Sequence, residues 1–113
     1  MKYKSPLIAV TGIERSKAFY KKYLGLDAEA DFGANVTLTG GVALQTLETW
    51  QGFIGGKDVC FKSNAGELYF VEDDFDGFIQ NLDGLELVHT VIEKFRRPLN
   101  AKIPNRRSYL RTV

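Results

Sequence analysis

The sequence predicts an α+β domain, in which helices cover one side of mostly antiparallel strands. Two observations favour this class: short apolar runs end at turn residues, and two helical patterns each follow such a run. A third is an internal repeat of four pairs of similar residues at a spacing of 59: Phe19 and Phe78, Tyr23 and Leu82, Gly25 and Gly84, Leu26 and Leu85. We therefore expect two similar modules.

Length and composition limit the possibilities. The chain has 113 residues, 44% of them hydrophobic and 26% charged, which suits a single domain over residues 1–113. The longest uncharged stretch, residues 32–47, contains three glycines and is shorter than the ~18 apolar residues that a membrane span needs. No signal-peptide pattern is visible, so we expect a cytoplasmic protein with no membrane role. The single Cys60 predicts a buried, inert thiol.

The first module, about residues 5–47, begins with an apolar strand at 7–10 that leads into a helix. Thr11 and Glu14 have the three-residue spacing of a capping box, which predicts the helix start. Gly25 predicts its end, because glycine takes the left-handed conformation of a helix C-terminus without strain.

Strands and glycine turns follow this helix. Three strands are expected, at residues 28–32, 36–38 and 42–47. Gly40 and Gly41 predict a hairpin between the last two strands. The next residues, 48–56, predict a loop or a short helical turn.

The second module, about residues 67–113, repeats the order of strand and helix. A strand at 68–71 precedes Asp73 and Asp74, either of which could cap a helix. The apolar residues of that helix share one face: Phe75, Phe78, Ile79 and Leu82. A further strand is expected at 85–91, and residues 108–113 could form a last one.

Charge divides the chain near residue 93. Residues 1–93 contain eight basic and 14 acidic residues and have a net charge of −6. Residues 94–113 contain seven basic residues and no acidic residue, a net charge of +7, so the total is +1. A basic segment can bind phosphate groups. Because only Phe95 and Tyr109 accompany the basic residues, we expect a solvated or partner-facing segment and no nucleic-acid partner.

Two motifs carry a resemblance to a known superfamily. They are IAVTGIERSKAFYKKYLGL at residues 8–26 and ELYFVEDDFDGF at residues 67–78. Both resemble the vicinal oxygen chelate superfamily, which includes glyoxalase I, bleomycin-resistance proteins, fosfomycin-resistance thiol transferases and extradiol dioxygenases. The resemblance covers about residues 5–91. It implies paired βαβββ modules that form a curved mixed sheet around a cleft, and it implies a homodimer.

The resemblance also identifies where metal ligands would lie. Metal-dependent members hold a divalent ion with side chains from the first strand of each module and from late strands. By resemblance these positions fall on Ser5, Glu67 and Gln45, and Glu67 alone is a strong ligand. The carboxylate of the last strand has no counterpart after Val91. We therefore expect no metal site, with a divalent metal as the alternative.

The departure from the superfamily pattern begins about where the charge changes sign. We therefore hypothesise that the atypical segment 94–113 arose abruptly, for instance by a reading-frame shift.

Six residues are candidates for contact with a ligand in the cleft: Phe32, Gln45, Trp50, Phe53, Glu67 and His89. The three aromatic residues could stack on a planar or apolar ligand, or instead cover a core edge or a dimer contact. Gln45 and Glu67 occupy the positions that the resemblance implies. His89 is the only imidazole, for which a structural role is the alternative.

The sequence thus predicts a glyoxalase- and bleomycin-resistance-like protein that binds a small organic ligand in its cleft. No catalytic residue is assigned. The alternative function is that of a metal-dependent lyase, isomerase or dioxygenase of the same superfamily.

Overall fold

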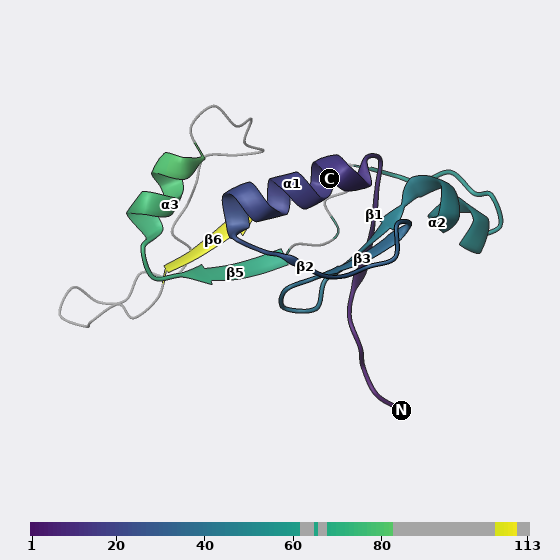
Figure 1. Cartoon of the computed structure of the whole chain (residues 1–113), viewed down its shortest axis with the longest axis horizontal. Helices are drawn as coiled ribbons and strands as arrows, with labels where there is room; N and C mark the ends of the chain where they lie inside the picture. The colour runs from purple at the N-terminus through teal and green to yellow at the C-terminus, as the bar shows by residue number, and fades with distance from the viewer. Residues whose placement is uncertain (62–64, 66–67, 83–105, 111–113) are drawn as a thin grey trace. The chain divides into compact units, whose positions relative to one another are not determined.

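The computed structural model describes residues 1–61, 65, 68–82 and 106–110. The chain divides into two compact units, Met1–Phe61 and Lys62–Val113, and the division lies between the two predicted modules. The first unit contains, in order, β1 (Leu7–Val10), α1 (Ile13–Leu24), β2 (Ala28–Asp31), β3 (Asn35–Leu38), β4 (Ala43–Thr46) and α2 (Leu47–Phe53) (Figure 1). In the second unit the described elements are β5 (Leu68–Glu72), α3 (Phe75–Asn81) and β6 (Arg106–Leu110).

The first unit is a mixed four-stranded sheet with the strand order β1-β4-β3-β2. β1 runs parallel to β4, whereas β3 is antiparallel to both of its neighbours. A parallel pair needs a crossover, and here α1, β2 and β3 lie between the two strands in the sequence. Because this is a strand, a helix and three strands, the α+β prediction and the βαβββ order are confirmed for the first module.

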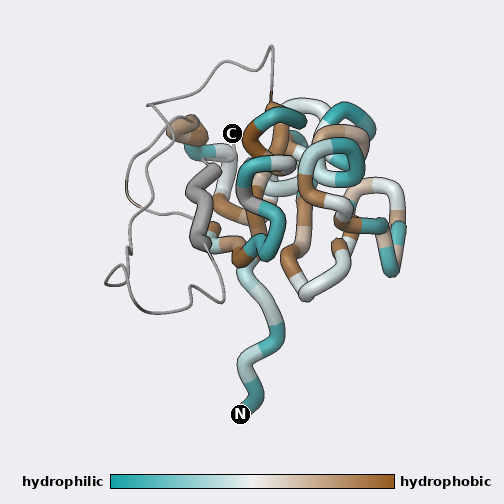
Figure 2. The backbone as a smooth tube through the Cα atoms, turned by 90° about the vertical axis from the view of Figure 1, so that its left-hand side faces the viewer, coloured by the Kyte–Doolittle hydropathy of each residue, from teal (hydrophilic) through white to brown (hydrophobic). Residues whose placement is uncertain are grey.

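The core of this unit lies between the sheet and α1. Val10, Val36, Leu38 and Leu44 are at most 2% exposed, and Tyr20 of α1 packs with them. Full burial of such an aliphatic side chain contributes about 1.5–3 kcal/mol. In Figure 2 the segment that leads from the N-terminus to β1 is teal and pale, without a brown, hydrophobic stretch.

Helix α1 confirms one predicted boundary and corrects the other. Gly25 has φ 66° and ends the helix, with Leu26 N–H donating to Tyr20 O over 3.1 Å. The N-cap is Gly12, so the prediction that Thr11 caps the helix is wrong. Arg15 Nη2 donates to Thr11 Oγ1 over 2.6 Å, which engages the hydroxyl that a capping box would use.

The predicted hairpin between β3 and β4 is also present. Gly40 and Gly41 have φ values of 89° and 100°, which side-chain-bearing residues rarely adopt. Leu38 N–H donates to Val42 O over 2.8 Å across the turn. The glycine pair therefore closes the hairpin that its position in the sequence predicts.

In the second unit, β5 and β6 form an antiparallel pair whose register places Glu72 opposite Arg106. Asp74 is the N-cap of α3, and its Oδ1 accepts from Gly77 N–H over 3.1 Å. The helix after the acidic run is therefore confirmed, with Asp74 as the capping residue. The strand expected within 108–113 is present as part of β6, whereas the one expected at 85–91 lies outside the described residues.

Cys60 corrects another expectation. The sequence predicts that the thiol of Cys60 is buried, but in the structure Cys60 is exposed, so that prediction is wrong. It follows α2 in a segment, residues 57–61, that forms neither helix nor strand. Among the described residues, no helix is long and apolar enough to cross a membrane.

Candidate functional site

The turn between β2 and β3 exposes a large aromatic ring. Asp31 Oδ1 accepts from Gly33 N–H over 2.9 Å, and Phe32 N–H donates to Asn35 O over 2.8 Å, so the turn closes on itself. Gly33 has φ 81°, which favours glycine there. These bonds leave Phe32 78% exposed at the tip.

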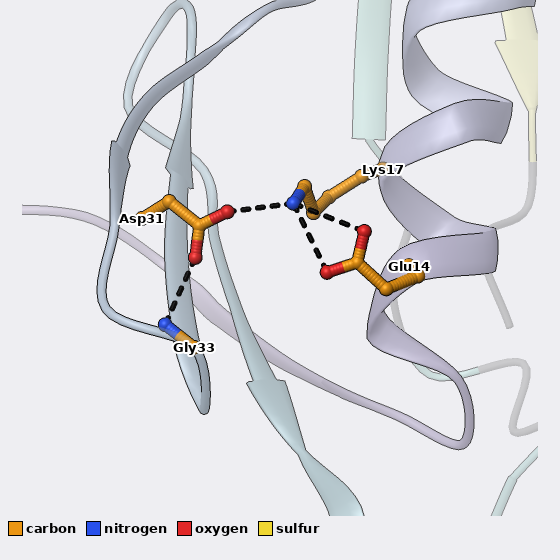
Figure 3. A network of polar contacts seen from close by, with 4 residues as sticks. All are labelled: Glu14, Lys17, Asp31 and Gly33. Carbon is orange, nitrogen blue, oxygen red and sulfur yellow. Dashed lines mark hydrogen bonds and ion pairs between the residues drawn. The ribbon is translucent and has the colours of Figure 1, made fainter.

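A lysine from α1 anchors the same turn (Figure 3). Lys17 Nζ lies 2.6 Å from Asp31 Oδ2 and 3.1 Å from Glu14 Oε1. The hydrogen bond from Lys17 lowers the pKa of Asp31 below its usual 3.8, and the Gly33 N–H adds to this shift. The hydrogen bond to Asp31, with a smaller effect from Glu14, raises the pKa of Lys17. Both partners therefore stay charged at neutral pH.

Gln45, a predicted ligand contact, is a buried polar residue in β4. It is 4% exposed, and its side chain bonds to protein at both ends. Asn35 Nδ2 donates to its Oε1 over 2.7 Å, and its Nε2 donates to Thr49 Oγ1 over 2.6 Å. The amide is thus satisfied within the fold, as buried polar groups must be.

Thr49 extends this network into α2. Its hydroxyl donates to Thr46 O over 3.0 Å, and the hydroxyls of Thr46 and Thr49 are 2.7 Å apart. Either hydroxyl can be the donor between them. Thr49 therefore contacts the side chains of both Gln45 and Thr46.

Helix α2 carries the other two aromatic candidates. Phe53 is 70% exposed and Trp50 is half-buried. Because the two residues are three positions apart in the helix, they are neighbours on one helix face. The helix follows β4 directly (Figure 1). Glycines with positive φ, Gly55 and Gly56, come soon after its last turn.

We call Phe32, Trp50 and Phe53 the aromatic end. Their segments meet at one end of the first sheet, because Thr46 N–H donates to Ala34 O over 2.9 Å at the junction of β4 and α2. Four of the six candidate residues thus belong to one end of one unit. The other two, Glu67 and His89, lie outside the described residues.

Sequence reasoning missed several residues that fix this end. Asn35, Lys17 and Asp31 gave no signal, because their roles depend on which strands and helix turns become neighbours. Thr46 did have a signal, because threonine is a favoured N-cap residue, and Thr46 is the N-cap of α2.

The next question is whether the described part of the chain contains side chains that could bind a metal ion. There, no group of three or more His, Cys, Asp or Glu side chains could hold an ion. Gln45, the position that resemblance implies for a ligand, directs both ends of its amide at protein partners. Glu67, the stronger ligand that the resemblance implies, lies outside the described residues.

Comparison with known proteins addresses the family. A family model for a glyoxalase-like domain matches residues 3–103. Comparison with curated proteins gave no match. Among solved structures, the chain is similar to a protein of unknown function from Agrobacterium tumefaciens str. C58, with 29% sequence identity and a TM-score of 0.73. The match covers 83% of the present chain and 77% of the Agrobacterium chain. Because the glyoxalase-like family model matches most of the chain and the first unit has the βαβββ order, the chain belongs to the glyoxalase-like domain family of the vicinal oxygen chelate superfamily.

Proposed function

We propose that this protein binds a small, planar organic molecule, which stacks on the rings of the aromatic end. The observation that carries the proposal is the exposure of two phenylalanines, Phe32 at 78% and Phe53 at 70%, on segments that meet at one end of the sheet. Aromatic faces stack on planar ligands, and burial of their apolar area favours binding. The proposal assigns no catalytic residue.

Rigidity of the two segments supports the proposal. The turn that carries Phe32 is closed by its own hydrogen bonds and tied to α1 by Lys17. Helix α2 is joined to β4 through Thr49. A ligand that meets ordered rings loses less free energy to side-chain and loop ordering than one that meets a mobile loop.

The test is a titration with the planar apolar probe anilinonaphthalene sulfonate, followed by the increase in its fluorescence. We expect saturable binding to the wild type and at least about tenfold weaker binding to Phe32→Ser and Phe53→Ser, because each change removes a stacking surface. Tyr3→Ser is the matched control, since it removes an aromatic side chain that is 84% exposed outside the aromatic end. Equal binding by all four proteins would refute the proposal.

The metal-dependent alternative has a separate test. Elemental analysis of protein purified without chelator is expected to give far less than one Ni, Zn, Mn or Fe per chain. Near-stoichiometric metal that is lost in Glu67→Gln would favour a lyase, isomerase or dioxygenase instead. Glu67 and His89 stay predicted ligand contacts, and their alanine variants belong in the same titration.

Two further properties are part of the proposal. We propose a homodimer, which sedimentation equilibrium at several concentrations would test; a mass of one chain at all concentrations contradicts it. We also propose a cytoplasmic location, which cell fractionation would test.

A further inference from the structure

Helix α2 is short and only partly buried. It has seven residues, Leu47–Phe53, and none of them is buried. A helix of this length does not form on its own in water, because nucleation costs more than so few hydrogen bonds return. Its position therefore depends on contacts with the rest of the unit, and the hydrogen bond from Gln45 to Thr49 is one that reaches it from the sheet.

Those contacts begin at a fixed point in the sheet. Asn35 and Gln45 lie opposite each other in the β3–β4 register, and the Asn35 amide donates to Gln45 Oε1 over 2.7 Å. This bond orients the buried Gln45 side chain so that its Nε2 points at Thr49 Oγ1, 2.6 Å away. The sheet thus sets the direction of the bond that α2 receives.

We infer that Gln45 and Thr49 are positioning residues that hold α2, and with it Trp50 and Phe53, in the orientation that binds the ligand. The hydrogen bonds from Asn35 to Gln45 and from Gln45 to Thr49 are together called the latch. The inference rests on the proposed function for its ligand, but the effect of the latch on α2 can be measured in ligand-free protein. Neither residue needs to touch the ligand. Their effect passes through Trp50, which directly follows Thr49 in the chain.

The key variant is Thr49→Val, which keeps the side-chain shape and removes the hydroxyl. Thr49→Ser is its matched partner, because it restores the hydroxyl. Thr39→Val is the control elsewhere in the module, because Thr39 Oγ1 is also hydrogen-bonded: it accepts from Asp27 N–H and donates to Asp27 O. Gln45→Leu removes the residue at the middle of the network. If this core variant fails to fold, the comparison of Thr49→Val with Thr49→Ser still tests the positioning role.

The first measurement is amide hydrogen exchange in ligand-free protein, at Ile54, whose N–H donates to Trp50 O over 3.2 Å. We expect exchange at least about fivefold faster in Thr49→Val, the factor for loss of one net hydrogen bond. Thr49→Ser and Thr39→Val are expected to match the wild type at Ile54. Trp50 is the only tryptophan, so a shift of its emission in Thr49→Val alone gives a second, independent signal.

The reference amide is Leu38, which donates to Val42 O in the β3–β4 hairpin and should not change. Unchanged Ile54 exchange in Thr49→Val overturns the latch and means that apolar contacts hold α2.

The second measurement is the affinity for anilinonaphthalene sulfonate. We expect it to fall about fivefold in Thr49→Val and to return in Thr49→Ser. If the wild type does not bind the probe while Ile54 responds as expected, the proposed function fails and the latch stands. If the probe binds equally well to Thr49→Val despite faster exchange, the positioning role is wrong.

Discussion

Lys17 Nζ lies 2.6 Å from Asp31 Oδ2, so that one side chain ties helix α1 to the end of strand β2. The lysine side chain is 22% exposed, against 37% for Asp31 and 80% for Glu14, which makes it the most shielded of the three side chains. Asp31 also receives the Gly33 N–H. The ion pair and the turn that carries Phe32 therefore depend on the same carboxylate.

Lys17→Met is expected to lower the melting temperature by about 1–3 °C, because partly exposed ion pairs contribute little. Added salt should shrink the difference from the wild type, since it screens the pair. Thermal unfolding followed by circular dichroism measures both effects. Lys57→Met is the control, at an exposed lysine outside the helices and strands. An equal loss in both variants would contradict the role given to Lys17.

The pH dependence of this ion pair follows from the shifts of its two partners. The pKa of Asp31 is below its usual 3.8, so its contribution is present above that value and is lost as the pH falls through the lowered pKa. The pKa of Lys17 is above 10.5, so its contribution is present below that value and is lost as the pH rises through the raised pKa. Melting temperatures of the wild type and Asp31→Asn should differ at neutral pH and converge in acid; a constant difference would show that Asp31 acts without its charge.

Leu44→Ala tests the core of the first unit. Leu44 is fully buried in β4, so its truncation leaves a cavity and should cost about 2–5 kcal/mol of unfolding free energy. Leu7→Ala, in the neighbouring strand β1, is the control because Leu7 is 41% exposed and should cost less than about 1 kcal/mol. Urea unfolding gives both values. Similar losses would mean that Leu7 and Leu44 are equally buried in solution.

Two glycines are expected to respond to alanine with opposite signs. Gly25→Ala should destabilise the protein by about 1–2 kcal/mol, because φ 66° strains any residue with a Cβ. Gly52→Ala should stabilise it by about 0.5–1 kcal/mol, because Gly52 is helical and nothing lies within 4 Å of an added Cβ. Urea unfolding of both variants measures the signs, and a gain in Gly25→Ala would contradict the left-handed cap.

Sequence rules predicted the features that depend on neighbouring residues. Gly25 ends a helix and Asp74 begins one because a cap needs partners only three to six residues away. The Gly40–Gly41 hairpin is equally local. Thr11 shows the limit of such rules, because Arg15 engages its hydroxyl and Gly12 becomes the cap.

The candidate site was predictable by residue type but not by geometry. Phe32 and Phe53 were named from their chemistry, and their exposure follows from a turn and a helix end. The burial of Gln45 was not predictable, because Asn35 becomes its partner only through the β3–β4 register. A glutamine expected to face a ligand thus proves to be hydrogen-bonded within the fold.

The parallel pairing of β1 with β4 has a consequence for the order of folding. Leu7 lies opposite Ala43 in the register, although β1 precedes the other strands of this unit in the chain. The β3–β4 hairpin closes a short loop, whereas β1 must close a loop several times longer to reach its partner. On the ribosome, β1 stays without its parallel partner until Thr46 has emerged. We therefore expect β1, the first strand of this module to be made, to be the last that joins its sheet.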